Sequence, residues 1–570
     1  MNQRRSSFAV FVALGLVLAA CGGTQTSASP SADASAGEPG GTLVFAGARL
    51  AASLDPALTS DGESFRILRQ VYETLVDLAP GSTNELAPSL AETWECEPQE
   101  TTCTFHLRAG VTFHDGTPLN AEAVKINFDR MQNFSEEFQA DAYYYDQVFD
   151  GFGADNIVAS IDTPDEQTVV FNLREPNPSF LIALTLPCFG IVSPAVLEST
   201  NADDFATTTL TTDAVQGGTG PFILDSYTPD ENATLSRNED YWGDKALLER
   251  LIIQPIADPA ARLQALQGGS IQGFDLVNPS DYETVTSEGF TLVERLSFNS
   301  LYLGLNPVAR ENAAAAEPPK TYYGDAGDSP LADVNVRRAI ELAIDKAALI
   351  EPFYGGRGSV ATTFIPETSE WADTVEGGVT PNEYDPAAAQ QLLADAGFTA
   401  DNPATLHFWY PTEVTRPYMP DPAGLHQAIT QMLEDAGFVV AAHSDIWDSP
   451  GYLLDAQSGY YDLHFLGWTG DWDDPGNFYG IHFGYSQGQP ADQFGCDVPG
   501  LEDAINTATS ELEEGARGEA WAEVAGLIHE NVCFVTLVHG DTALAFADTV
   551  QGYQANPTGS ETFATVSISE

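Results

Sequence analysis

The stretch GWTGDWDDPGNF at residues 467–478 places one carboxylate, Asp471, between two tryptophans, Trp468 and Trp472. It follows residues 461–466, whose length and aromatic content predict a buried strand. It then breaks into a turn rich in Gly, Asp and Pro. One fixed charge inside an apolar wall suits a site that orients a cationic ligand and tolerates varied side chains. The same residues also fit an acidic turn packed on structural aromatics, so the motif alone leaves both interpretations open.

Neighbouring carboxylates at Asp471, Asp473 and Asp474 raise a rival class, an exported hydrolase with an acid/base pair. Glycosidase carboxylates face each other roughly 5–10 Å apart across the bond that is cleaved, and neighbours on one turn are badly placed for that. The chain also has no Gly-x-Ser-x-Gly sequence to supply a nucleophile. An enzyme is therefore the least favoured class, and we expect no catalytic residues.

The amino-acid composition limits the number of domains and the classes of partner that the protein can bind. With 570 residues the chain is too long for one core, so two or three domains are expected. The 22 basic and 83 acidic residues give a formal net charge of −61. Such a field repels nucleic acid and anionic lipid, so no nucleic-acid partner is expected. Counter-ions screen the charge, and it is no guide to the ligand.

The N-terminus predicts export. Arg4 and Arg5 precede an apolar run at residues 8–20 that is too short to span a bilayer as a permanent helix. The run ends in LAACG, which looks like a bacterial lipoprotein signal with Cys21 as the lipidated residue. An ordinary secretory signal is the alternative. We predict a signal peptide at 1–20, a flexible tether at 21–40, and a protein anchored to the outer face of the cell membrane through Cys21.

The remaining cysteines fit an export compartment, which permits disulfides. Cys96 and Cys103 flank a turn-like segment, so we expect them to pair, and Cys496 with Cys533 is the second expected pair. This leaves Cys188 without a partner, although connectivity cannot be read from spacing. None of these cysteines has C-x-x-C spacing, and the nine histidines are scattered. We therefore expect no metal site and no cofactor.

The chain changes character along its length. Residues 104–173 are rich in short strands, whereas from about residue 298 helices and strands alternate, which indicates an α/β domain. Two of those helices begin at Asp385-Pro386 and Asp421-Pro422 and end at glycines, as capping rules predict. Residues 301–306 alternate in polarity with a period of two, which predicts a half-buried strand.

Nearly the whole mature chain resembles one family, the extracytoplasmic solute-binding proteins of peptide and nickel ABC importers (family 5). The resemblance lies in the order and spacing of several short segments. The segments that carry the resemblance are residues 53–56, 113–116, 219–222, 238–243, 336–340, 343–345, 384–386 and 467–478.

This resemblance implies a periplasmic-binding-protein fold of class II type, with two hinged α/β lobes and an extra α+β domain inserted in the first lobe. The implied ranges are 41–62, 194–297 and 545–570 for the first lobe, 63–193 for the inserted domain and 298–544 for the second lobe. The ligand is engulfed as the lobes close. The implied partners are a small peptide and an ABC permease of the cytoplasmic membrane, and the implied state is a monomer.

In that family the aspartate at the position of Asp471 pairs with the peptide's ammonium, and the backbone at Gly467 and Thr469 binds the peptide like an added strand. Arg416, in an Arg-Pro-Tyr segment with Tyr418, matches the arginine of the dipeptide-binding branch and is assigned to the peptide carboxylate. The aromatics either line the pocket or fill the core, and they are Tyr410, Trp447, Trp468 and Trp472. The same fold also serves nickel chelates, haem, opines and oligosaccharides, which stay open as alternative cargoes.

Overall fold

The computed structural model describes residues 40–51, 53–96, 99–153, 156–200, 217–309, 311, 329–447, 451–486, 489–559 and 561–569. The expected signal peptide (1–20), Cys21 and the tether up to residue 39 lie outside these ranges. Within them, no helix is both long and apolar enough to cross a membrane. Residues 37–570 group together as one unit.

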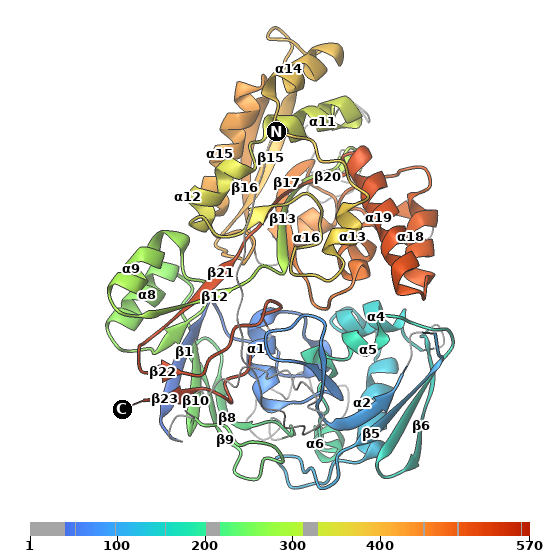
Figure 1. Cartoon of the computed structure of the whole chain (residues 1–570), viewed down its shortest axis with the longest axis vertical. Coiled ribbons are helices and arrows are strands. Elements are labelled where there is room, and N and C mark those ends of the chain that lie inside the picture. Colours follow the sequence, from blue (N-terminus) through green and yellow to red (C-terminus); the bar gives the residue numbers. More distant parts are fainter. Residues whose placement is uncertain are drawn as a thin grey trace, which may run out of the picture. The chain divides into compact units, whose positions relative to one another are not determined.

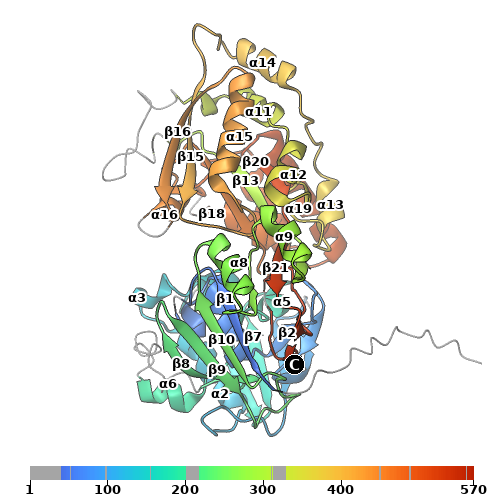
Figure 2. The same cartoon turned by 90° about the vertical axis from the view of Figure 1, so that its left-hand side faces the viewer.

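Strands from both ends of the chain meet in a seven-stranded sheet with the order β12-β21-β11-β1-β10-β9-β8. In this sheet β1 pairs in parallel with β10 and β11, and the other neighbours are antiparallel. Figure 2 shows β1, β10, β9 and β8 side by side. The strands are β1 Thr42–Gly47, β8 Phe222–Thr228, β9 Asn232–Arg237, β10 Arg250–Pro255, β11 Gly273–Phe274, β12 Thr291–Arg295 and β21 Thr542–Phe546.

An antiparallel four-stranded sheet, β4-β5-β7-β6, has helix α2 packed against it (Figure 1). Its strands are β4 Ala91–Glu95, β5 Thr102–Leu107, β6 Val158–Asp165 and β7 Thr168–Leu173. The helices and the hairpin of this part are α1 Gly62–Val71, α2 Ala121–Gln132, α3 Glu136–Gln139, α4 Tyr143–Phe149, α5 Phe180–Ala183, α6 Pro194–Thr200, β2 Val76–Leu78 and β3 Leu86–Pro88. One buried cluster of side chains, called here the first core, joins this sheet to the seven-stranded sheet. Helices α8 Pro259–Gln267 and α9 Tyr282–Ser287 bury a smaller cluster on the seven-stranded sheet.

A six-stranded sheet, β14-β20-β13-β17-β15-β16, carries the second core. Its strands are β13 Asn299–Leu305, β14 Ser359–Val360, β15 Thr405–Thr412, β16 Val439–Ile446, β17 Leu463–Thr469 and β20 Phe534–His539. Its helices are α11 Val334–Ala343, α12 Ile350–Tyr354, α13 Ala372–Glu376, α14 Pro386–Asp395, α15 Pro422–Asp435, α16 Tyr452–Gln457, α17 Ile481–Phe483, α18 Leu501–Ser510 and α19 Glu514–Glu530. Short ladders β18 Tyr485–Ser486 with β19 Gln489–Pro490, and β22 Val550–Gln551 with β23 Ser567–Ile568, complete the sheets.

The chain passes from the seven-stranded to the six-stranded sheet between β12 and β13, and returns between β20 and β21. The return falls at residues 540–541, because β21 from Thr542 onward already pairs with β12 and β11. The expected boundary after residue 544 lies within β21. If the two large sheets move relative to each other, the backbone has to bend at these two connections.

Local sequence signals explain the helix ends. Asn120 caps α2, and Asp385 and Asp421 cap α14 and α15, each accepting a hydrogen bond from a backbone N–H in the first turn. The glycines that follow the last two helices, Gly397 and Gly437, have φ of +89° and +104°, a conformation that other residues adopt only at a cost. These helix boundaries are confirmed.

The expectation for residues 301–306 was wrong in one respect. Strand β13 forms as predicted, but all seven of its residues are buried rather than every second one. It lies between β20 and β17 in the middle of the sheet, so neither edge nor face is open to water.

The cysteines form two disulfides in the structure, Cys96–Cys103 and Cys496–Cys533, which are the two expected pairs. Cys188 is a free, buried thiol.

Candidate ligand-binding site

Strand β17 carries the glycine-tryptophan segment to the edge of the second core. Its ladder with β13 runs to Thr469, whereas its parallel ladder with β15 ends at His464. The part of β17 from Phe465 to Thr469 therefore has a ladder neighbour on one side only among the described strands. A side chain at Gly467 would lie 2.3 Å from the ring of Tyr418, so glycine is required for this ring to pack on the strand. The structure thus brings two of the predicted site residues, Gly467 and Tyr418, into contact.

Beyond β17, Asp471 is held by two side chains. Tyr144 on α4 donates its hydroxyl hydrogen to Asp471 Oδ1 over 2.6 Å. Asn477 donates from Nδ2 to Asp471 Oδ2 over 3.3 Å, and its own Oδ1 accepts from the Asp471 backbone N–H over 2.9 Å. The indole of Trp468 donates to the same Asn477 oxygen over 3.2 Å. Asn477 therefore fixes the orientation of both Trp468 and Asp471.

The carboxyl group of Asp471 is electrostatically uncompensated. Burial raises the pKa of Asp471 to about 7, and the hydrogen bonds from Tyr144 and Asn477 only partly oppose this rise. In the described part of the chain, no lysine or arginine contributes to lowering it. A carboxylate that is taken out of water without a cation is unstable. A positive group brought next to Asp471 would compensate this charge.

The two tryptophans have different environments. Trp468 is half-buried and meets the ring of His482 edge-on at 4.8 Å. Trp472 is 5% exposed and belongs to the first core, where its ring meets that of Tyr144 edge-on at 6.5 Å. The turn that carries Asp471 therefore inserts one aromatic side chain into the other core. Thr469, the last residue of β17, is half-buried.

Arg416 lies in the loop after β15. The turn is closed by backbone hydrogen bonds in both directions between Arg416 and Met419. Its guanidinium stacks over the ring of Trp447 at 4.5 Å. The buried Nε has no hydrogen-bond partner among the described residues, and Arg416 forms no ion pair with them. The arginine is thus held in place by an aromatic face and keeps its charge free for an anion.

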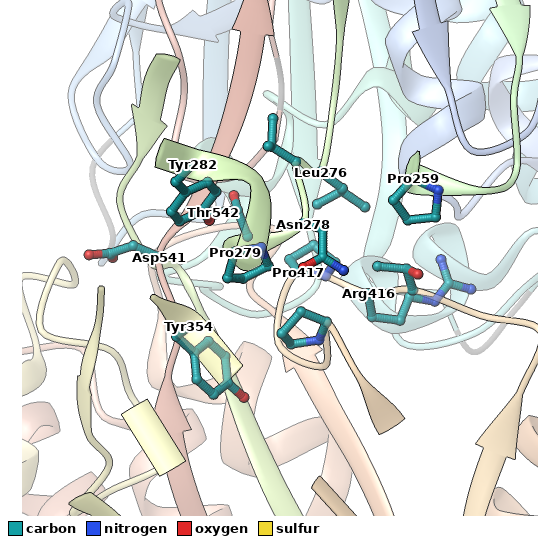
Figure 3. Close-up of a pocket in the computed structure, with 13 residues that line it drawn as sticks. Pro259, Leu276, Asn278, Pro279, Tyr282, Tyr354, Arg416, Pro417, Asp541 and Thr542 are labelled. Carbon is teal, nitrogen blue, oxygen red and sulfur yellow. The ribbon is translucent and has the colours of Figure 1, made fainter. Parts of the chain in front are cut away.

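Arg416 borders a pocket of about 350 Å³, counting its open mouth. Figure 3 shows Tyr282 and Asp541 on one side of this pocket and Arg416 on the other, with its guanidinium directed away from them. Asp471 does not line this pocket. The two charged groups therefore belong to different parts of the site. The other residues that line the pocket are Pro259, Leu276, Val277, Asn278, Pro279, Tyr354, Thr415, Pro417, Pro420 and Thr542.

The histidines near this region are structural. His464 is fully buried, and burial lowers its pKa to about 3. His482 is also buried, and its Nδ1 lies 2.8 Å from the carbonyl oxygen of Phe478, one turn earlier. Among the described residues no group of three or more His, Cys, Asp or Glu side chains could hold a metal ion.

Sequence reasoning missed three residues near Asp471. Tyr144 donates to the carboxylate, Asn477 orients it, and the buried Cys188 lies close enough for Asp471 to raise the pKa of its thiol further. Asn477 stands in the same stretch as Asp471, where an amide six residues later could have been noticed. Nothing in the sequence connects Tyr144 or Cys188 with that stretch.

The fold and the site define an extracytoplasmic solute-binding protein rather than an enzyme, and comparison with known proteins supports this class. Residues 85–490 match the profile of the bacterial extracellular solute-binding proteins, family 5 Middle. The chain belongs to this family, and the expected α/β fold of periplasmic-binding-protein type is confirmed.

Individual relatives cover almost the whole chain. It is 28% identical to the dipeptide-binding protein of Escherichia coli (strain K12) over 537 residues, which are 92% of this chain and 94% of the relative. It is 27% identical to heme-binding protein A of Haemophilus influenzae over 562 residues, 97% of each chain. Among solved structures, the periplasmic binding protein DppA of Helicobacter pylori in complex with the peptide STSA has a TM-score of 0.75 at 25% identity, covering 94% of this chain and 99% of that one.

Proposed function

We propose that this chain is the substrate-binding component of an ABC importer that captures short peptides with free termini. One observation carries the proposal: two opposite charges, Asp471 and Arg416, lack an ion-pair partner among the described residues. A carboxylate without a cation and a guanidinium without an anion together suit a ligand that is positive at one end and negative at the other. A peptide with a free amino group and a free carboxylate has this charge pattern whatever its side chains are.

The edge of β17 supports the same ligand. Beyond His464 this strand has β13 as its ladder neighbour on one side. Its other edge offers the backbone N–H and C=O groups of Gly467 and Thr469 to a peptide that lies alongside as an added strand. Main-chain hydrogen bonds do not depend on the peptide's side chains, so they favour a broad set of sequences. The half-buried Trp468 supplies apolar surface next to Asp471.

Two lobes would close over the peptide. In this proposal the first lobe contains the seven-stranded sheet with the four-stranded sheet as its inserted domain, and the second lobe contains the six-stranded sheet. The connections at residues 296–298 and 540–541 act as the hinge. The mature protein is a monomer that is anchored through a lipid on Cys21 and delivers its peptide to a membrane permease.

A thermal-shift screen tests the cargo. Dialanine and trialanine should raise the melting temperature, by an amount that corresponds to about 2.7 kcal/mol at 100 times the dissociation constant. N-acetylated dialanine and dialanine amide should each raise it much less, because each lacks one terminal charge. Haem, a nickel–histidine chelate, an opine and a maltooligosaccharide form the other arms. The proposal is wrong if one of these stabilises the protein and the free peptides do not.

Lipidation has its own test. Cells that express the full chain should carry it in the membrane fraction, and Cys21→Ala should release it into the soluble extracytoplasmic fraction. A wild-type chain that is cleaved but remains in the soluble fraction would favour an ordinary secretory signal instead.

A further inference from the structure

The turn after β17 carries two further carboxylates that do not face the proposed ammonium site. Asp473 and Asp474 are 4% and 3% exposed, so both are almost completely buried. Buried carboxylates need hydrogen-bond or ionic partners to be tolerated. Their partners come from both lobes.

Asp473 is bound by a hydroxyl from each lobe. The hydroxyl of Thr83, in the loop between β2 and β3, donates to Asp473 Oδ2 over 2.9 Å. From the second lobe, Ser369 donates its hydroxyl hydrogen to Oδ1, and the Glu370 backbone N–H donates to Oδ2 over 3.2 Å. Thr83 is itself 5% exposed. A buried hydrogen bond to a carboxylate thus links the β2–β3 hairpin of the first lobe to the turn that carries Asp471.

Asp474 is bound by an arginine that also reaches across. Arg517, on α19, pairs through a guanidinium nitrogen with Asp474 Oδ2 at 2.6 Å. The same nitrogen donates to the hydroxyl of Ser179 over 3.1 Å, and Ser179 directly precedes α5 of the first lobe. The guanidinium also lies over the ring of Trp371 at 5.6 Å. Its position is therefore fixed by the second lobe, while Ser179 is its contact with the first.

The junction around these contacts is loosely packed. A cavity of about 810 Å³, counting its open mouth, is lined from the first lobe by the β2–β3 and α5 regions and from the second lobe by Trp371, Asp473, Asp474 and Arg517. Water can enter a cavity of this size. Thr83 and Ser179 each directly adjoin a residue that lines this cavity, and their hydrogen bonds join its two sides.

We propose that the Thr83–Asp473 and Ser179–Arg517 hydrogen bonds form a clasp that holds the two lobes closed and thereby sets how slowly a bound ligand leaves. The inference rests on the proposed function, because it assigns a role to closure around a ligand. Thr83, Ser179 and Arg517 are positioning residues: they act through the Asp471-bearing turn and do not touch the ligand. Since a bound ligand leaves only after the lobes have separated, loss of the clasp speeds dissociation.

Two single substitutions remove the first-lobe halves of the clasp. Thr83→Val keeps the shape of the side chain without its hydroxyl, and Ser179→Ala does not remove a helix cap, because the Ser179 side chain makes no capping hydrogen bond. Each should raise the dissociation rate of dialanine about tenfold, the size expected for one hydrogen bond to a charged group. Thr83→Ser restores the hydroxyl and should restore the slow rate.

Matched controls remove a hydroxyl-to-carboxylate bond that lies inside one sheet. Thr168→Val loses a 3.0 Å bond to Asp165 in the β6–β7 hairpin, and Ser236→Ala loses a 2.8 Å bond to Asp225 between β9 and β8. Both should leave the dissociation rate at the wild-type value. If the clasp variants behave like these controls while wild-type protein binds dialanine, the clasp is wrong and the proposed function stands.

Small-angle X-ray scattering of the ligand-free proteins decides the remaining case. If wild-type protein does not bind dialanine, the proposed function fails, and the clasp is judged by the radius of gyration alone. A larger radius for Thr83→Val and Ser179→Ala than for wild type and both controls supports the clasp. Equal radii in all five proteins overturn it.

Discussion

The hydroxyl of Tyr144 lies 2.6 Å from Asp471 Oδ1 and donates its hydrogen to it. Tyr144 is on α4 and 4% exposed, whereas Asp471 follows β17. This neutral donor is the strongest partner that Asp471 has in the described part of the chain, and the pKa of Asp471 still rises to about 7. Asp471 therefore takes up its proton in a pH range that is accessible to binding and unfolding experiments. Three predictions follow from this protonation.

Ligand affinity should depend on pH with a maximum between about 7 and 8. Below pH 7 Asp471 becomes protonated and no longer attracts an ammonium group. Above pH 8 the peptide's own α-amino group loses its proton, since its ordinary pKa is about 7.7–8.0. Calorimetric titration with dialanine from pH 5 to 9 measures both limbs. Asp471→Asn should weaken binding about 10- to 100-fold at pH 7 and abolish the lower limb. An unchanged lower limb in this variant would assign it to another group.

Removal of the Tyr144 hydroxyl should move the lower limb to higher pH. The hydrogen bond from Tyr144 stabilises the charged form of Asp471, so Tyr144→Phe raises the pKa of this carboxyl group further. The pH at which affinity is half-maximal should rise by about one unit. Tyr145→Phe is the matched control, because Tyr145 lies on the same helix and its oxygen accepts from Asn156 instead. If both variants shift equally, the effect comes from α4 and not from the bond to Asp471.

Ligand-free stability should respond to Asp471 with the opposite pH trend. The pKa of Asp471 is about 7 in the folded chain against an ordinary value of 3.8, so the folded state binds more protons between these values. Stability contributed by this group is therefore complete below pH 4 and is lost as pH rises through 7, by up to about 1.4 kcal/mol per pH unit. Urea unfolding of wild type and Asp471→Asn at pH 4, 5.5 and 7 isolates this difference. A difference that is constant with pH would contradict the shifted pKa.

The features that could be predicted from the sequence depend mostly on residues that are close together in the chain. The caps at Asn120, Asp385 and Asp421 depend on residues within one helical turn, and all three are in place. The segments at 219–222 and 238–243 were recognised as motifs, but their purpose was not. In the structure Thr219, Tyr241 and Trp242 all donate to the carboxyl group of the half-buried Glu73. These motifs converge on one acid.

The missing parts of the site are non-local. Tyr144 and Asp471 are 327 residues apart in the chain, and no spacing rule connects positions so distant. The same holds for Thr83 and Asp473, which are 390 residues apart. Strand β13 shows the same limit in the fold, because its alternating pattern predicted one exposed face and its neighbours in the sheet cover both. The residue types in this chain predict where a charge or a strand lies. Which residues contact that charge or pair with that strand depends on tertiary packing.

Arg416 should control recognition of the peptide's carboxylate. Arg416→Met keeps an apolar side chain against Trp447 but removes the charge, so dialanine should bind about tenfold more weakly. Dialanine amide should bind the variant and the wild type equally, and the preference for the free acid should vanish. Calorimetry with both ligands measures the change. Arg237→Met, which removes a half-buried arginine that pairs with Glu239, is the control and should change neither affinity.

Salt should stabilise the folded chain through its net charge of −61. The 83 acidic residues repel one another most when they are held together in the folded state, and the repulsion is screened as the Debye length falls from about 10 Å at 0.1 M to about 3 Å at 1 M. Urea unfolding should therefore give a free energy that rises between 0.05 and about 1 M NaCl. Choline chloride at equal ionic strength should act similarly, because screening does not require a particular cation. Glu502→Gln with Asp503→Asn, in the first turn of α18, should reduce the salt dependence. A free energy that is independent of both salts would show that the acidic surface carries no net repulsion in the folded state.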